Sequence, residues 1–132
     1  EELSLLVVHD NMLTGDLPTT IGHLTKLRKL DLGGNQLSGS LPTELGLLTE
    51  LTALVLRDNQ FVGGFPSEVG LLTNLDSVII ESNLLTGSIP PEVCSLWNAA
   101  LREFGKKPGS SCNDQSYGGL TCPDGDCCRS CP

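Results

Sequence analysis

The residues best suited to chemistry are six cysteines, two histidines and an Asp-Gly-Asp turn. The cysteines all fall near the C-terminal end of a chain that has none elsewhere: Cys94, Cys112, Cys122, Cys127, Cys128 and Cys131. A dense, even-numbered cluster of this kind predicts disulfides, and disulfides persist in an oxidising compartment. We therefore expect a secreted or cell-surface protein.

Metal binding is the competing interpretation of these residues. The spacings of Cys122 to Cys127 and Cys128 to Cys131 could suggest zinc, but the tail contains no histidine, so disulfides are favoured. Asp124 and Asp126 flank Gly125 as in a fragment of a calcium loop that lacks its other ligands, which favours a plain turn. The sequence predicts no metal and no cofactor.

Composition excludes several classes of function. The net charge of −8 and the sequence pI near 4.5 disfavour nucleic acid, which needs a basic face. No apolar run approaches the roughly 20 residues of a transmembrane helix, so direct membrane insertion is not expected. The serines fall in expected turns, and neither His9 nor His23 has a neighbouring nucleophile, so we expect no enzyme.

Most of the chain before the cysteine tail is a 24-residue repeat, which must position His9, His23 and Cys94. The 24-residue period is marked by an asparagine in each unit: Asn11, Asn35, Asn59 and Asn83. Seven apolar columns stay in step with the asparagines through four units, at residues 3–26, 27–50, 51–74 and 75–98. Columns held over four units predict a solenoid in which each unit buries its inward face on its neighbours. We assign residues 1–98 to the repeats and residues 99–132 to a C-terminal capping segment.

Each column has a physical role. The Leu-x-Leu alternation predicts a short strand with one side inward and the other on a concave surface. The asparagine amide can satisfy backbone groups where the chain turns off the strand, so stacked asparagines are expected to form a ladder.

The units match the leucine-rich repeat consensus, Leu-x-x-Leu-x-Leu-x-x-Asn-x-Leu, and resemble its plant-type 24-residue subclass. That subclass occurs in plant receptor ectodomains, polygalacturonase-inhibitor-like proteins and many algal proteins. The resemblance implies an α/β-type solenoid with a short parallel sheet on the concave face and an irregular convex side. The six-cysteine tail resembles the disulfide-rich C-terminal cap of secreted leucine-rich repeat proteins of diatoms and related algae.

Both ends of the repeat depart from the pattern. Residues 95–105 fit a short helix with Ser95 as its N-cap and Gly105 as its terminator, and a final strand at residues 101–104 is a close rival. In either case Trp97, Leu101 and Phe104 are expected to cover the end of the core, with Cys94 joining the tail to the last repeat. The first unit has no cap, so we expect four apolar side chains to face water there: Leu3, Leu6, Val8 and Leu13. We also expect further repeats or a partner chain at this open rung.

The outward strand positions are the expected binding surface. The candidate ligand-binding residues are Leu5, Val7, His9, Lys29, Asp31, Val55, Arg57, Asp58, Ile79 and Glu81. We expect Arg57, Asp58 and Glu81 to pair across neighbouring rungs. The strip measures only ~200–300 Å² in projection, against roughly 800 Å² per partner in a standard interface.

Two functions fit this organisation. The leading hypothesis is an extracellular recognition or adhesion module that binds a protein or a cell-wall or surface polysaccharide. The alternative is a structural subunit of an extracellular assembly or fibre that stacks through its open N-terminal end.

Overall fold

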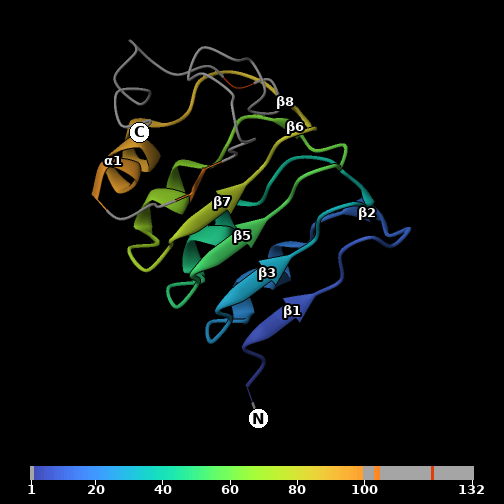
Figure 1. Cartoon of the computed structure of the whole chain (residues 1–132), viewed down its shortest axis with the longest axis horizontal. Helices are drawn as coiled ribbons and strands as arrows, with labels where there is room; N and C mark the ends of the chain where they lie inside the picture. Colours follow the sequence, from blue (N-terminus) through green and yellow to red (C-terminus); the bar gives the residue numbers. More distant parts are fainter. Residues whose placement is uncertain (1, 100–102, 105–119, 121–132) are drawn as a thin grey trace.

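A computed structural model describes residues 2–99, 103–104 and 120. For residues 97–99, 103 and 104 only the backbone is described. The chain winds into a stack of coils, with the first strand at one end and helix α1 at the other (Figure 1). None of the helices in the described part is long and apolar enough to cross a membrane.

Five parallel strands form the main sheet, in the order β1-β3-β5-β7-β9. Their bounds are Leu5–Val7, Lys29–Asp31, Ala53–Val55, Ser77–Ile79 and Glu103–Phe104. Between β1 and β7 each residue pairs with the residue 24 positions later, as in Leu6 with Leu30 and Leu30 with Leu54. This register confirms the predicted columns on the strand side.

Two smaller sheets follow the turn that each asparagine makes. Strand β2 (Thr14–Asp16) pairs with β4 (Gln36–Ser38), and β6 (Val62–Gly63) pairs with β8 (Leu84–Leu85). Here the partners are 22 residues apart, as in Asp16 with Ser38. The 24-residue columns therefore do not describe neighbours on this side of the coil.

The opposite side carries three 3₁₀ helices, each introduced by an extended proline. They are η1 (Thr19–His23), η2 (Thr43–Leu47) and η3 (Ser67–Leu71), preceded by Pro18, Pro42 and Pro66. Proline suits this position because it ends the extended segment and has no backbone N–H to donate. Each helix packs on the next, and η3 packs on α1.

The core lies between the main sheet and the helices, and it is built from the inward columns. Leu30, Leu54 and Val78 are fully buried, as is Phe61. Leu120, which the repeat pattern does not place, also belongs to this core. Burial of these side chains is the main driving force for stacking the coils.

The glycines of the 3₁₀ helices allow the coils to approach closely. A Cβ atom at Gly46 would lie 2.7 Å from both Cβ and the carbonyl oxygen of Glu68 in the next coil. Gly22 and Gly70 face the next coil in the same way. The fourth unit has Cys94 in this column, within helix α1 (Pro91–Ala99).

Helix α1 differs from the predicted helix of residues 95–105. It begins at Pro91, so Ser95 lies inside the helix and is not its N-cap; the Ser95 hydroxyl donates to the Pro91 carbonyl at 3.0 Å. The segment occupies the place of a 3₁₀ helix, and the absence of the glycine lets it continue as an α-helix. The rival strand of residues 101–104 is confirmed over its last two residues, where β9 pairs with β7; residues 101 and 102 lie outside the described residues.

Other expectations for this end lie outside the described residues. These concern Leu101, Gly105, Cys112, Cys122, Cys127, Cys128 and Cys131, and the side chains of Trp97 and Phe104.

The asparagine ladder joins consecutive coils, or rungs. The Asn59 amide donates to the Leu32 carbonyl of the preceding rung at 2.9 Å and to the Leu56 carbonyl of its own rung at 3.1 Å. A third contact reaches the Arg57 carbonyl at 3.2 Å, and Asn59 Oδ1 accepts from the Leu37 N–H at 3.0 Å. One side chain therefore satisfies four backbone groups of two rungs.

Asn35 and Asn83 make the same four contacts. Asn11 in the first rung makes only two, to the carbonyls of Val8 at 3.0 Å and His9 at 3.1 Å.

We predict that Gly46→Ala lowers the free energy of unfolding by about 1–3 kcal/mol, because the new methyl group overpacks the contact with Glu68. Urea denaturation measures the change. Gly64→Ala is the matched control, since a Cβ there meets nothing within 4 Å, and it should be neutral or stabilising by up to about 1 kcal/mol. Equal effects of the two substitutions would contradict the close-packing argument.

We predict that Asn59→Ala lowers the free energy of unfolding by about 3 kcal/mol or more. Each buried backbone group left without a partner costs about 1–3 kcal/mol. Asn11→Ala, at an exposed residue with contacts only inside its own rung, should cost less than about 1 kcal/mol. The same denaturation measurement on both variants tests the difference, and similar losses would refute the role given to cross-rung bonds.

Candidate binding surface

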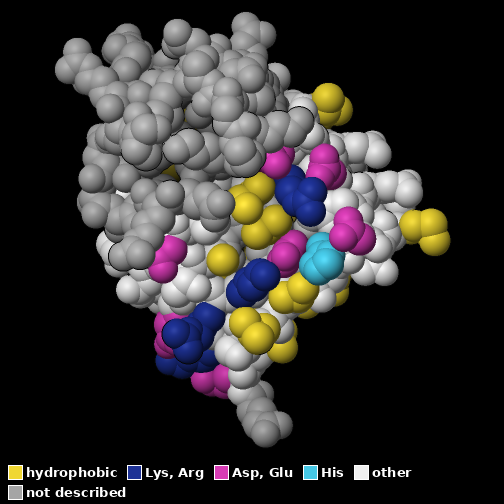
Figure 2. Space-filling model, in the orientation of Figure 1, with side chains coloured by type: hydrophobic (Ala, Val, Ile, Leu, Met, Phe, Trp, Pro, Cys, Tyr) yellow, Lys and Arg dark blue, Asp and Glu magenta, His cyan; other side chains and the backbone are white. Residues whose placement is uncertain are grey.

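The outer face of the main sheet carries the predicted binding residues. Because side chains alternate along a strand, the residues between the buried leucines point away from the core. Figure 2 shows basic, acidic and hydrophobic side chains interspersed across this face. The arrangement is mixed in charge and has no large region of one sign.

Exposure differs sharply among the expected contact residues. Leu5 and Val7 are 58% and 44% exposed. Asp31 and Val55 were also expected to face solvent, but they are buried, at 8% and 9%. Four of the ten are half-buried, namely Lys29, Arg57, Ile79 and Glu81, and the remaining two, His9 and Asp58, are exposed.

Close packing around Gly33 accounts for the two buried positions. A Cβ atom at Gly33 would lie 3.3 Å from Arg57 Cγ and 3.5 Å from both Val55 Cγ1 and Asp31 Oδ1. The stem of Arg57 thus approaches the backbone at Gly33 beside Val55. A position that faces outward can therefore be covered by its neighbours.

Polar and charged side chains on this face pair with neighbours in their own rungs. His9 Nδ1 lies 2.9 Å from Asp10 Oδ2, Arg57 Nη1 lies 2.8 Å from Asp58 Oδ2, and Lys29 Nζ lies 3.5 Å from Asp31 Oδ2. The expected pairing of Asp58 across rungs is therefore wrong. A guanidinium reaches its chain neighbour because the turn after the strand folds the Asp58 side chain back beside it.

The turn depends on a backbone feature that the sequence analysis missed. Asp10, Asp58 and Ser82 have φ values of 55°, 54° and 54°, and Gly34 occupies the same column at 64°. Short polar side chains and glycine tolerate this left-handed conformation best. A column of Asp, Gly, Asp and Ser just before the asparagine was the available signal.

Among the hollows lined by described residues are two formed where neighbouring rungs meet. One, of about 300 Å³, is at the first rung and is lined by Glu2, Leu3, His23, Leu24, Thr25 and Lys26. The hydrogen bond that the Lys26 ammonium donates to the Glu50 carboxylate, with the negative charges of Glu50 and Glu2, raises the pKa of Lys26 above its ordinary value. The other, of about 520 Å³, is lined by Arg28, Glu50, Thr52, Thr73, Asn74 and Asp76.

Metal-ligating side chains do not gather in the described part of the chain, where no three His, Cys, Asp or Glu residues could together hold an ion. His9 lies after β1 and His23 at the end of η1. The Asp124–Asp126 turn lies outside the described residues.

Comparison with known proteins identifies the repeat. A family model described as leucine rich repeat matches residues 1–61. No curated protein matches the chain.

Solved structures match about three quarters of this chain. The crystal structure of PEPR1 with AtPEP1 is 40% identical over 77% of this chain, with a TM-score of 0.74. The ectodomain of the receptor kinase SOBIR1 from Arabidopsis thaliana is 32% identical over 78% of this chain, with a TM-score of 0.72. The Arabidopsis HAESA ectodomain in complex with the IDA peptide hormone is 35% identical over 77% of this chain, with a TM-score of 0.71.

The match covers 14%, 54% and 17% of those three chains, so this chain spans about half or less of each. The fold is that of a leucine-rich repeat solenoid similar to plant receptor ectodomains.

Proposed function

We propose that this leucine-rich repeat solenoid is an extracellular or cell-surface recognition module whose concave face binds a peptide or an extended protein segment. The observation that carries the proposal is one sheet face that bears the exposed apolar side chains of Leu5 and Val7 on β1 and the Arg57–Asp58 ion pair just after β5. The neighbours support it, because two of them were solved with peptides, AtPEP1 and the IDA hormone.

The dimensions of the face favour a peptide. Adjacent strands lie about 4.8 Å apart, so the four strands β1, β3, β5 and β7 offer a strip much smaller than a standard protein interface. An extended peptide can use such a strip completely. Because the ladder fixes the spacing of the rungs, binding loses little freedom on the side of the solenoid.

The charge pairs provide a means of recognition. The side chains of Arg57 and Asp58 are 42% and 45% exposed, and ion pairs in contact with solvent contribute only about 0–1 kcal/mol. A carboxylate of the partner can therefore replace Asp58 as the ligand of the guanidinium at small cost. Such exchange gives selectivity through charge complementarity.

Two other candidates each have one supporting observation. The 520 Å³ hollow, with its hydroxyl, amide, carboxylate and guanidinium groups, suits the hydroxyls of a surface polysaccharide. A structural subunit of an extracellular assembly would use the edge of β1 that pairs with no other described strand.

Peptides that bind the full chain can be selected from a displayed random library. We predict that the Arg57→Glu substitution in the chain lowers its affinity for these peptides at least about tenfold, equivalent to about 1.4 kcal/mol. Val7→Asp should lower the affinity for these peptides similarly, because it places a carboxylate in the apolar part of the strip. Isothermal titration calorimetry measures both, with thermal unfolding to verify the fold. Val7 suits the test better than Val55, whose burial means that an aspartate would also destabilise the chain.

The matched control is Arg28→Glu, the same charge reversal in the 520 Å³ hollow. It should leave peptide affinity unchanged. Loss of binding in Arg28→Glu with full binding in Arg57→Glu would move the site to the hollow and overturn concave recognition.

The extracellular location predicts that the six cysteines form disulfides, with Cys94 joining α1 to the tail. Thiol titration of the denatured, unreduced protein should find no free thiols, and titration after reduction should find six. Six free thiols before reduction would contradict both the disulfides and the compartment.

A further inference from the structure

The 520 Å³ hollow crosses three rungs at the edge where the chain enters the main sheet. Arg28, Thr52 and Asp76 directly precede β3, β5 and β7, so they form one column with one residue in each rung. Adjacent strands lie about 4.8 Å apart, which places the backbones of Arg28 and Asp76 about 10 Å apart at the two ends of the column. The loops that lead into β5 and β7 complete an entirely polar lining with Glu50, Thr73 and Asn74.

Hydrogen bonds between rungs hold the middle of this hollow in place. Thr52 Oγ1 and the Asn74 amide each donate to a carbonyl of the preceding rung, both at 2.9 Å. Glu50 Oε1 accepts from Lys26 Nζ at 2.7 Å. These bonds leave the second carboxylate oxygen of Glu50, the lone pairs of Thr52 Oγ1 and the Oδ1 atom of Asn74 available to a ligand. The fixed part of the hollow therefore presents mainly hydrogen-bond acceptors.

The two ends of the hollow carry opposite charges that have no partner among the described residues. Arg28 is exposed, and so is Asp76. The other three basic side chains in the described part of the chain each pair with a carboxylate: Lys26 with Glu50, Lys29 with Asp31 and Arg57 with Asp58. The Arg28 guanidinium thus supplies free donors at one end of the hollow, and the Asp76 carboxylate supplies free acceptors at the other.

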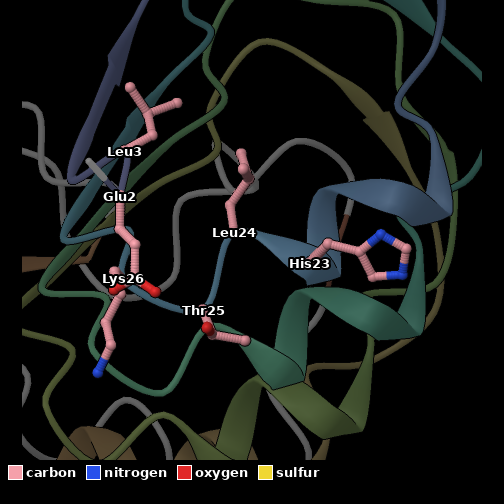
Figure 3. A pocket seen from close by; sticks show the side chains of 6 residues that line it. All are labelled: Glu2, Leu3, His23, Leu24, Thr25 and Lys26. Atoms are coloured by element: carbon pink, nitrogen blue, oxygen red, sulfur yellow. The ribbon is translucent and has the colours of Figure 1, made fainter.

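This polar lining does not follow from the repeat alone. The 300 Å³ hollow uses the columns of Thr73 and Asn74 through Thr25 and Lys26, but its lining also includes leucines. Figure 3 shows the side chains of Leu3 and Leu24 on one side of that hollow. The six polar groups of the larger hollow are therefore a property of the particular residues that line it.

The balance of charge favours a neutral ligand. Lys26 neutralises Glu50, and the charges of Arg28 and Asp76 offset each other. An anionic ligand at Arg28 would bring its charge towards the carboxylates of Glu50 and Asp76, whereas a cationic ligand at Asp76 would approach the guanidinium. A neutral molecule with many hydroxyl groups meets neither repulsion, and its O–H groups donate to the acceptors that dominate the lining.

We propose that this hollow is a second binding site, which takes a short neutral saccharide. Hydroxyls on neighbouring sugar carbons donate to the carboxylates of Asp76 and Glu50, and the Arg28 guanidinium donates to sugar oxygens at the opposite end. None of the six lining residues is aromatic, so affinity rests on hydrogen bonds, and we expect a Kd of about 1–10 mM. A glycan bound here anchors the module and leaves the concave face open to its peptide. The site adds to concave recognition and does not depend on it.

The test is a titration of the full chain with three neutral disaccharides, cellobiose, maltose and lactose, followed by ¹H–¹⁵N NMR. At least one of them should cause saturable shifts in the Asn74 side-chain amide and in the backbone amides of residues 50–52 and 74–76. The affinity should stay the same when sodium chloride is added, because the ligand carries no charge. Arg28→Ala and Asp76→Ala should each lower the affinity at least about tenfold, since each removes charged hydrogen-bond partners.

Arg57→Ala and Asp58→Ala are the matched controls, because they remove the same two residue types from the concave face. Both should leave saccharide affinity unchanged, and thermal unfolding verifies the fold of all four variants. The absence of saturable shifts with all three sugars would overturn the proposal. Tighter, salt-sensitive binding of glucuronate or glucosamine would assign the hollow to a charged ligand instead, and an equal loss in Arg57→Ala would place the sugar on the concave face. Peptide affinity is measured separately, so failure here is distinguishable from failure of the proposed function.

Discussion

The hydrogen bonds of the buried asparagines hold the coils of this protein at a fixed spacing. At each turn off a strand, several backbone groups of two rungs lose their sheet partners, and an unpaired buried group is costly. One primary amide meets this need, because it can donate to carbonyls of both rungs and accept an N–H from the preceding one. The strand register, the apolar columns and the close approach at the glycines all presuppose this spacing.

A fixed spacing also determines what the outer face can do. The sheet offers few residues per rung, and packing around Gly33 removes Asp31 and Val55 from contact with solvent. What remains is a narrow strip in which exposed apolar side chains lie beside weak ion pairs. Such a strip suits the extended peptide proposed above better than a globular surface, and one similar structure holds the IDA peptide hormone.

The last and the first described rungs differ in their backbone structure and hydrogen bonding. At the C-terminal end, Cys94 replaces the close-packing glycine, a 3₁₀ helix becomes α1, and β9 adds a further strand. At the first rung, Asn11 and the edge of β1 keep the hydrogen-bonding groups that stacking would use.

The sequence alone determined the rung length, the inward columns, the ladder positions and the leucine-rich repeat fold. It could do so because equivalent residues stack on one another, so that one pattern repeated four times specifies both sides of each contact. Only the tertiary structure decided that Val55 is covered, that Arg57 turns to Asp58, that α1 begins at Pro91, and that β2 meets β4 with a 22-residue offset. These outcomes depend on side-chain rotamers and on packing between particular neighbours, which differ from rung to rung, and a repeating pattern carries no information about such differences.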